Sequence, residues 1–114
     1  MAVDTAELGK RIGRAIAQAR LQRGLTQEQV AERLGVEQET ISRFERGAVL
    51  PPLGRLAELS DLLAVPMAQF VQAGSTRLAD QAQEVSDQLA ELSPADRELV
   101  RHWVVEMCAR LRGS

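Results

Sequence analysis

The residue types that most often build catalytic and metal sites are scarce in this chain of 114 residues. It has one cysteine, Cys108, which excludes an internal disulfide, and one histidine, His102. A single histidine and a single cysteine on one expected helix make a poor metal site. No nucleophile–histidine–acid set and no glycine-rich phosphate loop can be recognised either. The sequence therefore predicts a protein that is not an enzyme and that uses no metal and no cofactor.

Long apolar runs are also lacking. No run approaches the roughly 18 residues that a membrane-spanning helix needs. Residues 1–13 carry acids and glycine where a secretory signal needs a basic start and an apolar stretch. Apolar residues make up 45% of the chain and charged residues 26%, as in globular proteins, and the length suffices for one core with an extension. We expect a cytoplasmic protein that does not associate with membranes.

Positive charge is in slight deficit, because the net charge is −2. This argues against a protein that coats nucleic acid through charge alone. Residues 10–46 nevertheless carry eight basic and five acidic side chains, a local balance of +3, whereas residues 75–114 carry five arginines and seven acids. The basic residues near the N-terminus are most simply a solvated helix face. The uneven distribution points to the first half of the chain for any contact with an anion.

Apolar residues recur at helical spacing, and no long stretch alternates with period two, so an all-α fold is expected. Helix start and stop signals delimit the elements of the first part of the chain. The expected helices cover residues 7–22, 27–34, 38–45, 53–65 and 66–71.

Two of these helices lie in the stretch TQEQVAERLGVEQETISRFERG, residues 26–47, and are too short to be stable alone. They must therefore be held by tertiary contacts. A small residue, Ala31, allows the two helices to approach closely, Gly35 permits a positive φ in the tight turn, and the β-branched Ile41 packs beneath. Several independent constraints thus agree on a helix-turn-helix.

With these residues in place, the sequence resembles the Cro and CI phage repressor class of helix-turn-helix proteins, often called XRE-type regulators. The resemblance runs from about Leu8 to Val71, through TQEQVAERLGV, ISRFERG and PPLGRLAELSDLLAV. It implies a five-helix domain whose third helix lies in the major groove of DNA, and an internal ion pair between Arg20 and Glu45. After Gly47 the sequence departs from the family, because AVLPPL is apolar where some phage repressors have basic residues. Attraction to the DNA backbone should be weaker, and dimerisation more important.

The third helix carries the expected base contacts. If Ile41 and Phe44 face inward, the polar residues of this helix are left to face outward, namely Gln38, Glu39, Thr40 and Arg43. Arginine bonds bidentately to guanine, glutamine to adenine, glutamate accepts from the cytosine amino group, and threonine touches the thymine methyl group. Two alternatives stay open: Glu39 only favours the positive end of the helix, and Arg43 is only a solvated charge.

Thr26, Gln27 and Arg46 are the expected phosphate contacts. The first two lie at the start of the second helix, where free backbone N–H groups and the helix dipole favour anions. Thr26 is also a good N-cap, with Gln29 at the capping-box position, so it could serve as a cap alone.

The pattern changes after Gly74. Residues 78–92 have apolar residues spaced by alternating steps of four and three, a narrow seam of the coiled-coil kind, and Ser93 with Pro94 begins a further helix with a broad apolar face. We predict a DNA-binding domain at 1–74 and a C-terminal helical hairpin at 75–114 that forms a dimer interface. The interface residues are expected to be Leu78, Val85, Leu89, Leu99, Trp103, Met107 and Leu111. The open alternative is that these helices fold back on the first domain as one larger core.

These observations favour a sequence-specific transcriptional regulator that binds double-stranded DNA as a homodimer, most simply a repressor that occupies an operator. A second hypothesis is an antitoxin-like component whose C-terminal helices hold a protein partner while its first domain regulates its own operon. A third is a protein-binding module that has lost DNA binding.

Overall fold

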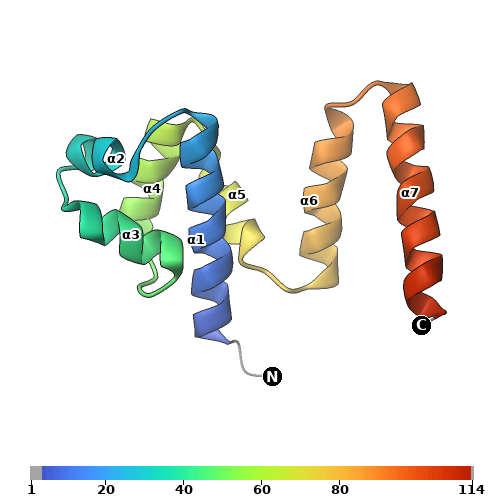
Figure 1. Ribbon diagram of the computed structural model, residues 1–114, viewed down its shortest axis with the longest axis horizontal. Helices are drawn as coiled ribbons and strands as arrows, with labels where there is room; N and C mark the ends of the chain where they lie inside the picture. The colour runs from blue at the N-terminus through green and yellow to red at the C-terminus, as the bar shows by residue number, and fades with distance from the viewer. Residues whose placement is uncertain (1–3, 114) are drawn as a thin grey trace. The chain divides into compact units, whose positions relative to one another are not determined.

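The computed structural model describes residues 4–113 as seven α-helices, with no strand in that range. The predicted all-α fold is confirmed (Figure 1). Two compact units meet within one helix, one ending at Gln81 and the other beginning at Ala82. The helices are α1 (Thr5–Gln22), α2 (Gln27–Leu34), α3 (Gln38–Arg46), α4 (Leu53–Leu63), α5 (Met67–Ala73), α6 (Leu78–Ala90) and α7 (Pro94–Arg112).

The ends of α2 follow from local sequence. The hydroxyl of Thr26 accepts a hydrogen bond from the backbone N–H of Gln29 (3.1 Å), and the Gln29 side chain accepts one from the N–H of Thr26 (2.9 Å). This is the predicted capping box, which satisfies two N–H groups of the helix start. Gly35 ends the helix with a φ of 69°, a left-handed conformation that glycine adopts without a steric penalty. The predicted tight turn is confirmed.

Several helix boundaries differ from the sequence-based expectation. α3 ends one residue later than expected, at Arg46, and α5 covers Met67–Ala73 where residues 66–71 were expected. α1 begins at Thr5, two residues earlier than expected, because the carboxylate of Asp4 accepts hydrogen bonds from the N–H groups of Ala6 and Glu7. α4 ends at Leu63 and not at residue 65, since Ala64 turns the chain with a φ of 56°.

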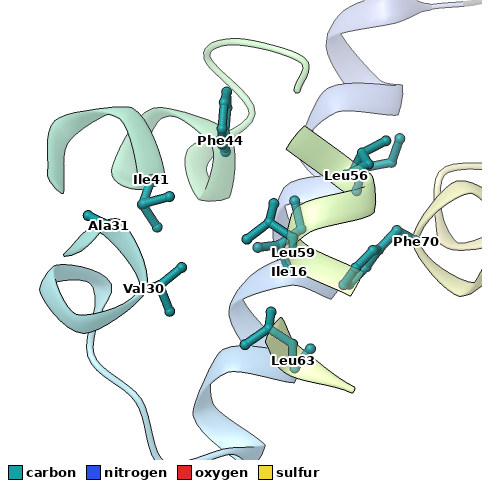
Figure 2. Packing of buried hydrophobic residues seen from close by; sticks show 11 residues of the cluster. Ile16, Val30, Ala31, Ile41, Phe44, Leu56, Leu59, Leu63 and Phe70 are labelled. Carbon is teal, nitrogen blue, oxygen red and sulfur yellow. The ribbon is translucent and has the colours of Figure 1, made fainter. Parts of the chain in front are cut away.

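The core of the first unit lies between α1, α2, α3, α4 and α5. Ile41 and Phe44 of α3 are buried, as expected, and Ala31 of α2 lies beside Ile41 (Figure 2). Gln38, Glu39 and Arg43, on the opposite side of α3, are exposed. The hydrophobic core cluster consists of Ile12, Ile16, Ala19, Val30, Ala31, Ile41, Phe44, Leu56, Leu59, Leu63 and Phe70.

Glycines allow α1 to cross the C-terminal end of α3 at backbone contact. A Cβ atom at Gly13 would lie 2.5 Å from the carbonyl oxygen of Glu45 and closer still to that of Phe44. A Cβ at Gly9 would lie 3.2 Å from the carbonyl oxygen of Gly47. Neither Gly9 nor Gly13 was predicted from the sequence to have this role. They fix how closely α1 supports α3 from behind.

We predict that Gly13→Ala destabilises the protein by about 1–3 kcal/mol, because the added methyl group forces two backbones apart. Urea unfolding followed by circular dichroism measures the loss. Gly54→Ala is the matched control, since a Cβ at Gly54 would meet nothing within 4 Å and alanine favours helix. Equal stability of the two variants would contradict the close approach of α1 and α3.

The second unit consists of the end of α6 and all of α7, which run antiparallel as a hairpin (Figure 1). The hydroxyl of Ser93 accepts a hydrogen bond from the N–H of Asp96 (3.2 Å), and Pro94 is the first helical residue, as predicted. No side chain of α6 or α7 is buried in the part of the chain that the structure describes. Within that part, no helix is long and apolar enough to cross a bilayer.

Candidate nucleic-acid interface

The outer side of α3 is a polar surface. Gln38, Glu39 and Arg43 are exposed, and Thr40 is half-buried. The inner side of the same helix holds Ile41 and Phe44 in the core, so the two sides cannot exchange places. All four residues expected to contact bases therefore lie on one short helix, although Thr40 presents less of its side chain than the other three.

The charged side chains of α3 contact one another. Oε1 of Glu39 accepts a hydrogen bond from Nη2 of Arg46 (2.8 Å) and lies 3.4 Å from Nε of Arg43. Arg46 also donates from Nε to the hydroxyl of Ser42 (3.2 Å). From the sequence, Glu39, Arg43 and Arg46 were expected to be independent DNA contacts. The structure brings them together on the exposed side of α3.

The expected phosphate contacts at the start of α2 differ in their surroundings. Thr26 is exposed, and its hydroxyl caps the helix. The side chain of Gln27 is half-buried and donates from Nε2 to Oε1 of Glu45 (3.0 Å), so it points into the protein. The N–H groups of the first helical turn have no partner within the helix. The backbone N–H of Gln27 is free for a phosphate, whereas one N–H of its side-chain amide is already bonded to Glu45.

Arg20 and Glu45 form an ion pair that joins α1 to α3. Arg20 donates from Nε to Oε2 of Glu45 (2.7 Å) and from Nη2 to Oε1 (3.0 Å), and its Nη1 donates to the carbonyl oxygen of Leu25 (2.9 Å). The side chains are only 13% and 6% exposed. A bidentate pair of this kind is geometrically specific, and it holds α3 and the segment before α2 on α1. Glu45 thus points into the fold, away from the exposed side of α3.

The segment after α3 carries exposed apolar side chains. Val49, Leu50 and Leu53 are all exposed between α3 and the start of α4. No basic side chain lies in residues 48–53. Any contribution of this segment to DNA binding is confined to apolar and backbone contacts.

The second unit exposes large apolar side chains that a single chain leaves in contact with water. Trp103 is 59% exposed and Leu99 is 49% exposed, whereas Leu89 is half-buried. Leu78, which begins α6 and belongs to the first unit, is 81% exposed. Val104 and Val105 are exposed as well, and the sequence pattern had not placed them at an interface. The other expected interface residues are also exposed, namely Val85, Met107 and Leu111.

Three other features concern metal binding, thiol chemistry and charge. The described residues include no group of three or more histidines, cysteines, aspartates or glutamates that could hold a metal ion. Cys108 is a free, exposed thiol. On the polar side of α7, Arg101 donates a hydrogen bond to Glu98 (2.6 Å) and holds the pKa of that carboxyl below its ordinary value.

Comparisons with known proteins agree on one family. A family model described as Helix-turn-helix matches residues 16–70. The uncharacterized HTH-type transcriptional regulator y4dJ of Sinorhizobium fredii is 37% identical over 65 residues, which make up 57% of this chain and 84% of the relative. The cryptic phage CTXphi transcriptional repressor RstR of Vibrio cholerae is 28% identical over 83 residues, which make up 73% of this chain and 75% of RstR.

A solved structure shows the same relationship. Bacillus thuringiensis PlcR, in complex with the peptide PapR7 and DNA, aligns with a TM-score of 0.59 and 30% identity. The alignment covers 71% of this chain and only 29% of the PlcR chain. Together with the turn geometry at Gly35, the matches confirm the resemblance drawn from the sequence. The chain belongs to the XRE-type helix-turn-helix family of DNA-binding transcriptional regulators, which are not enzymes.

Proposed function

We propose that the protein binds an operator in double-stranded DNA as a homodimer in the cytoplasm and represses transcription there. The observation that carries this proposal is the exposed polar side of α3, which the core and the Arg20–Glu45 pair support from behind. The similarity to RstR, a phage transcriptional repressor, favours repression. The similarity to PlcR, whose structure was solved in complex with DNA, favours direct DNA contact by the shared fold.

In this proposal α3 enters the major groove and Arg43 is the principal base reader. Its guanidinium is exposed, and a bidentate contact with guanine contributes about 1–3 kcal/mol of discrimination. Gln38, also exposed, is placed to pair with adenine, and Thr40 can offer its methyl group to thymine. Glu39 as an acceptor for cytosine remains a prediction.

Phosphate contacts flank the base readers. Thr26 and the backbone N–H of Gln27 lie at the positive end of α2, which favours an anion. Arg46 ends α3 and is exposed, so its guanidinium can reach a phosphate beside the groove. These contacts fix the register of the domain on DNA without reading sequence.

We assign residues 1–74 to DNA binding and residues 75–114 to dimerisation. One hydrogen bond links α5 to the first turn of α6, because the side chain of Gln72 donates to the backbone carbonyl oxygen of Asp80 (3.3 Å). In the connection between the two helices, the hydroxyl of Ser75 donates to Oδ2 of Asp80 (2.6 Å). The dimerisation segment is therefore tethered at its start to the helix that ends the DNA-binding domain.

The apolar side chains of α7 support a dimer. At 100° per residue, Leu99, Trp103, Met107 and Leu111 fall on one side of the helix, and Val104, Val105 and Cys108 continue the apolar arc well beyond it. One neighbouring helix cannot cover so broad an arc, so α7 needs its own α6 and a further partner. A second copy of the hairpin supplies that partner as a four-helix assembly. One module reads few base pairs, so a two-fold dimer also supplies the second half-site.

Selection of bound sequences from a random duplex pool tests the proposed function. We expect enrichment of an inverted repeat whose half-sites lie about one helical turn apart, roughly 34–36 Å. Arg43→Ala should lower discrimination at one base pair of each half-site by about tenfold or more. Arg14→Ala is the matched control, because it removes an exposed arginine of α1 that pairs with Glu7 of the same helix and with no residue of α3. A pool with no enriched sequence would contradict operator binding.

A further inference from the structure

Two arginines of α3 share one carboxylate oxygen. Oε1 of Glu39 lies 2.8 Å from Nη2 of Arg46 and 3.4 Å from Nε of Arg43. All three side chains are more than half exposed and lie on the outer side of the helix. Glu39 is therefore the one acid among the expected base contacts, and its charge is already offset by two neighbours.

The two arginines are held in different ways. Glu39 faces Arg43 at Nε, so both terminal Nη groups of Arg43 are without a hydrogen-bond partner among the residues described here. Arg46 is engaged at Nη2 by Glu39 and at Nε by Ser42, which holds its guanidinium along the helix surface. An arginine whose Nε is engaged by a carboxylate keeps both terminal nitrogens, Nη1 and Nη2, available to donate to a base edge. Of these two arginines, Arg43 has that arrangement.

Contact with DNA would strengthen this arrangement. An exposed pair of this kind contributes little in water, because solvent screens the charges. When the helix enters a groove, water leaves the site and the local dielectric falls, so the ion pair between Glu39 and Arg43 and the hydrogen bond from Arg46 to Glu39 become stronger. A carboxylate behind Arg43 then limits the rotamers available to it and favours the one that faces the groove.

We propose that Glu39 is a positioning residue that sets the orientation of Arg43 toward guanine, rather than a reader of cytosine itself. The proposal rests on the proposed function, in which α3 enters the major groove. It gives Glu39 a role in specificity without any contact with a base. It also explains how an acidic side chain is tolerated at a surface that must approach phosphates.

Base preferences of variants test the proposal. Binding is measured for operator duplexes in which each base pair is changed in turn. Arg43→Ala is expected to lose about tenfold discrimination at one base pair, and Glu39→Ala to lose about threefold or more at that same base pair. Affinity of Glu39→Ala for random duplex should be equal or higher, because a negative charge has been removed. The double variant should resemble Arg43→Ala, since the second change has nothing left to position.

A conservative variant separates positioning from overall stability. Glu39→Gln keeps an oxygen that can accept from Nε of Arg43, so it should retain most of the discrimination that Glu39→Ala loses. Thermal unfolding of the three single variants should match that of the wild type within a few degrees, since all the changed groups are exposed. A merely structural role would move the unfolding temperature and leave base preference unchanged.

Two results would overturn the inference while leaving the proposed function intact. Loss of discrimination by Glu39→Ala at a different base pair from Arg43→Ala would make Glu39 a base reader. No loss at any base pair would make its contacts with the arginines incidental. If the wild-type protein prefers no sequence, or Arg43→Ala changes nothing, the proposed function itself fails.

Discussion

Glu45→Ala is expected to lower the free energy of unfolding by about 3–5 kcal/mol, a large part of the stability of a domain of this size. The change leaves the Arg20 guanidinium, whose side chain is 13% exposed, without its carboxylate partner. It also removes the acceptor of the Gln27 side chain. The loss arises mainly because an uncompensated charge stays in a poorly solvated site. Urea unfolding followed by circular dichroism gives the difference.

Two further variants sharpen this experiment. Glu39→Ala removes an exposed acid from the same helix and should change stability by less than about 0.5 kcal/mol. The double variant Arg20→Met, Glu45→Met replaces both charges with apolar side chains and should be more stable than Glu45→Ala alone. If Glu45→Ala costs less than about 1 kcal/mol, the ion pair does not hold α1 to α3.

Leu99→Glu is expected to convert the protein to a monomer and to lower its affinity for the inverted-repeat operator by about 100-fold or more. Leu99 lies on the broad apolar side of α7 and is 49% exposed in the single chain. A charge there would be buried in the dimer without a partner, and the two DNA-binding domains would lose their linkage. Affinity for a single half-site should change little.

Sedimentation and tryptophan emission measure this loss. Trp103 is the only tryptophan of the chain, so its emission reports on the proposed interface alone. We expect emission at longer wavelength in Leu99→Glu and in highly diluted wild type. Ala109→Glu adds the same charge near the opposite side of α7 and should remain a dimer. A wild-type monomer at micromolar concentration would contradict the dimer and favour a different protein partner for these helices.

The helix-turn-helix could be predicted because its determinants are local. The Thr26 cap, the small Ala31, the left-handed Gly35 and the buried Ile41 lie within one short stretch and act on adjacent turns of chain. Each of these residues constrains the same two helices, so together they predict the helix-turn-helix more strongly than any one of them does.

Features that depend on distant parts of the chain could not be read in this way. The close approach at Gly13 depends on which side of α1 meets α3, and glycine inside a helix has no local signature of that role. The end of α4 at Ala64 was missed because a left-handed alanine is rare. The cap at Asp4 is local, and an aspartate directly before the apolar periodicity was a signal that could have located it.

At the candidate interface, residue types were predictable from sequence, but their pairing was not. The outward place of Gln38, Glu39 and Arg43 follows from helical periodicity once Ile41 is inside. The side chain of Gln27 donates a hydrogen bond to Glu45, which is far away in the sequence. Because side chains as long as these can reach many different partners, the sequence did not predict this pair. Helical periodicity therefore predicted which polar residues are exposed, but it did not predict which of their side chains form hydrogen bonds or ion pairs with other residues.

The glycine-mediated crossing of α1 and α3 has a consequence for how the protein adapts to its target. Backbones in direct contact leave no layer of side chains that could rearrange to let α3 rock or slide. In the proposed complex with DNA, α3 cannot shift within its own domain to follow an imperfect half-site, so bending or twisting of the DNA brings the bases to the helix. Operators with flexible pyrimidine–purine steps between the half-sites should bind more tightly than operators with stiff A-tracts there, although the protein does not contact these base pairs.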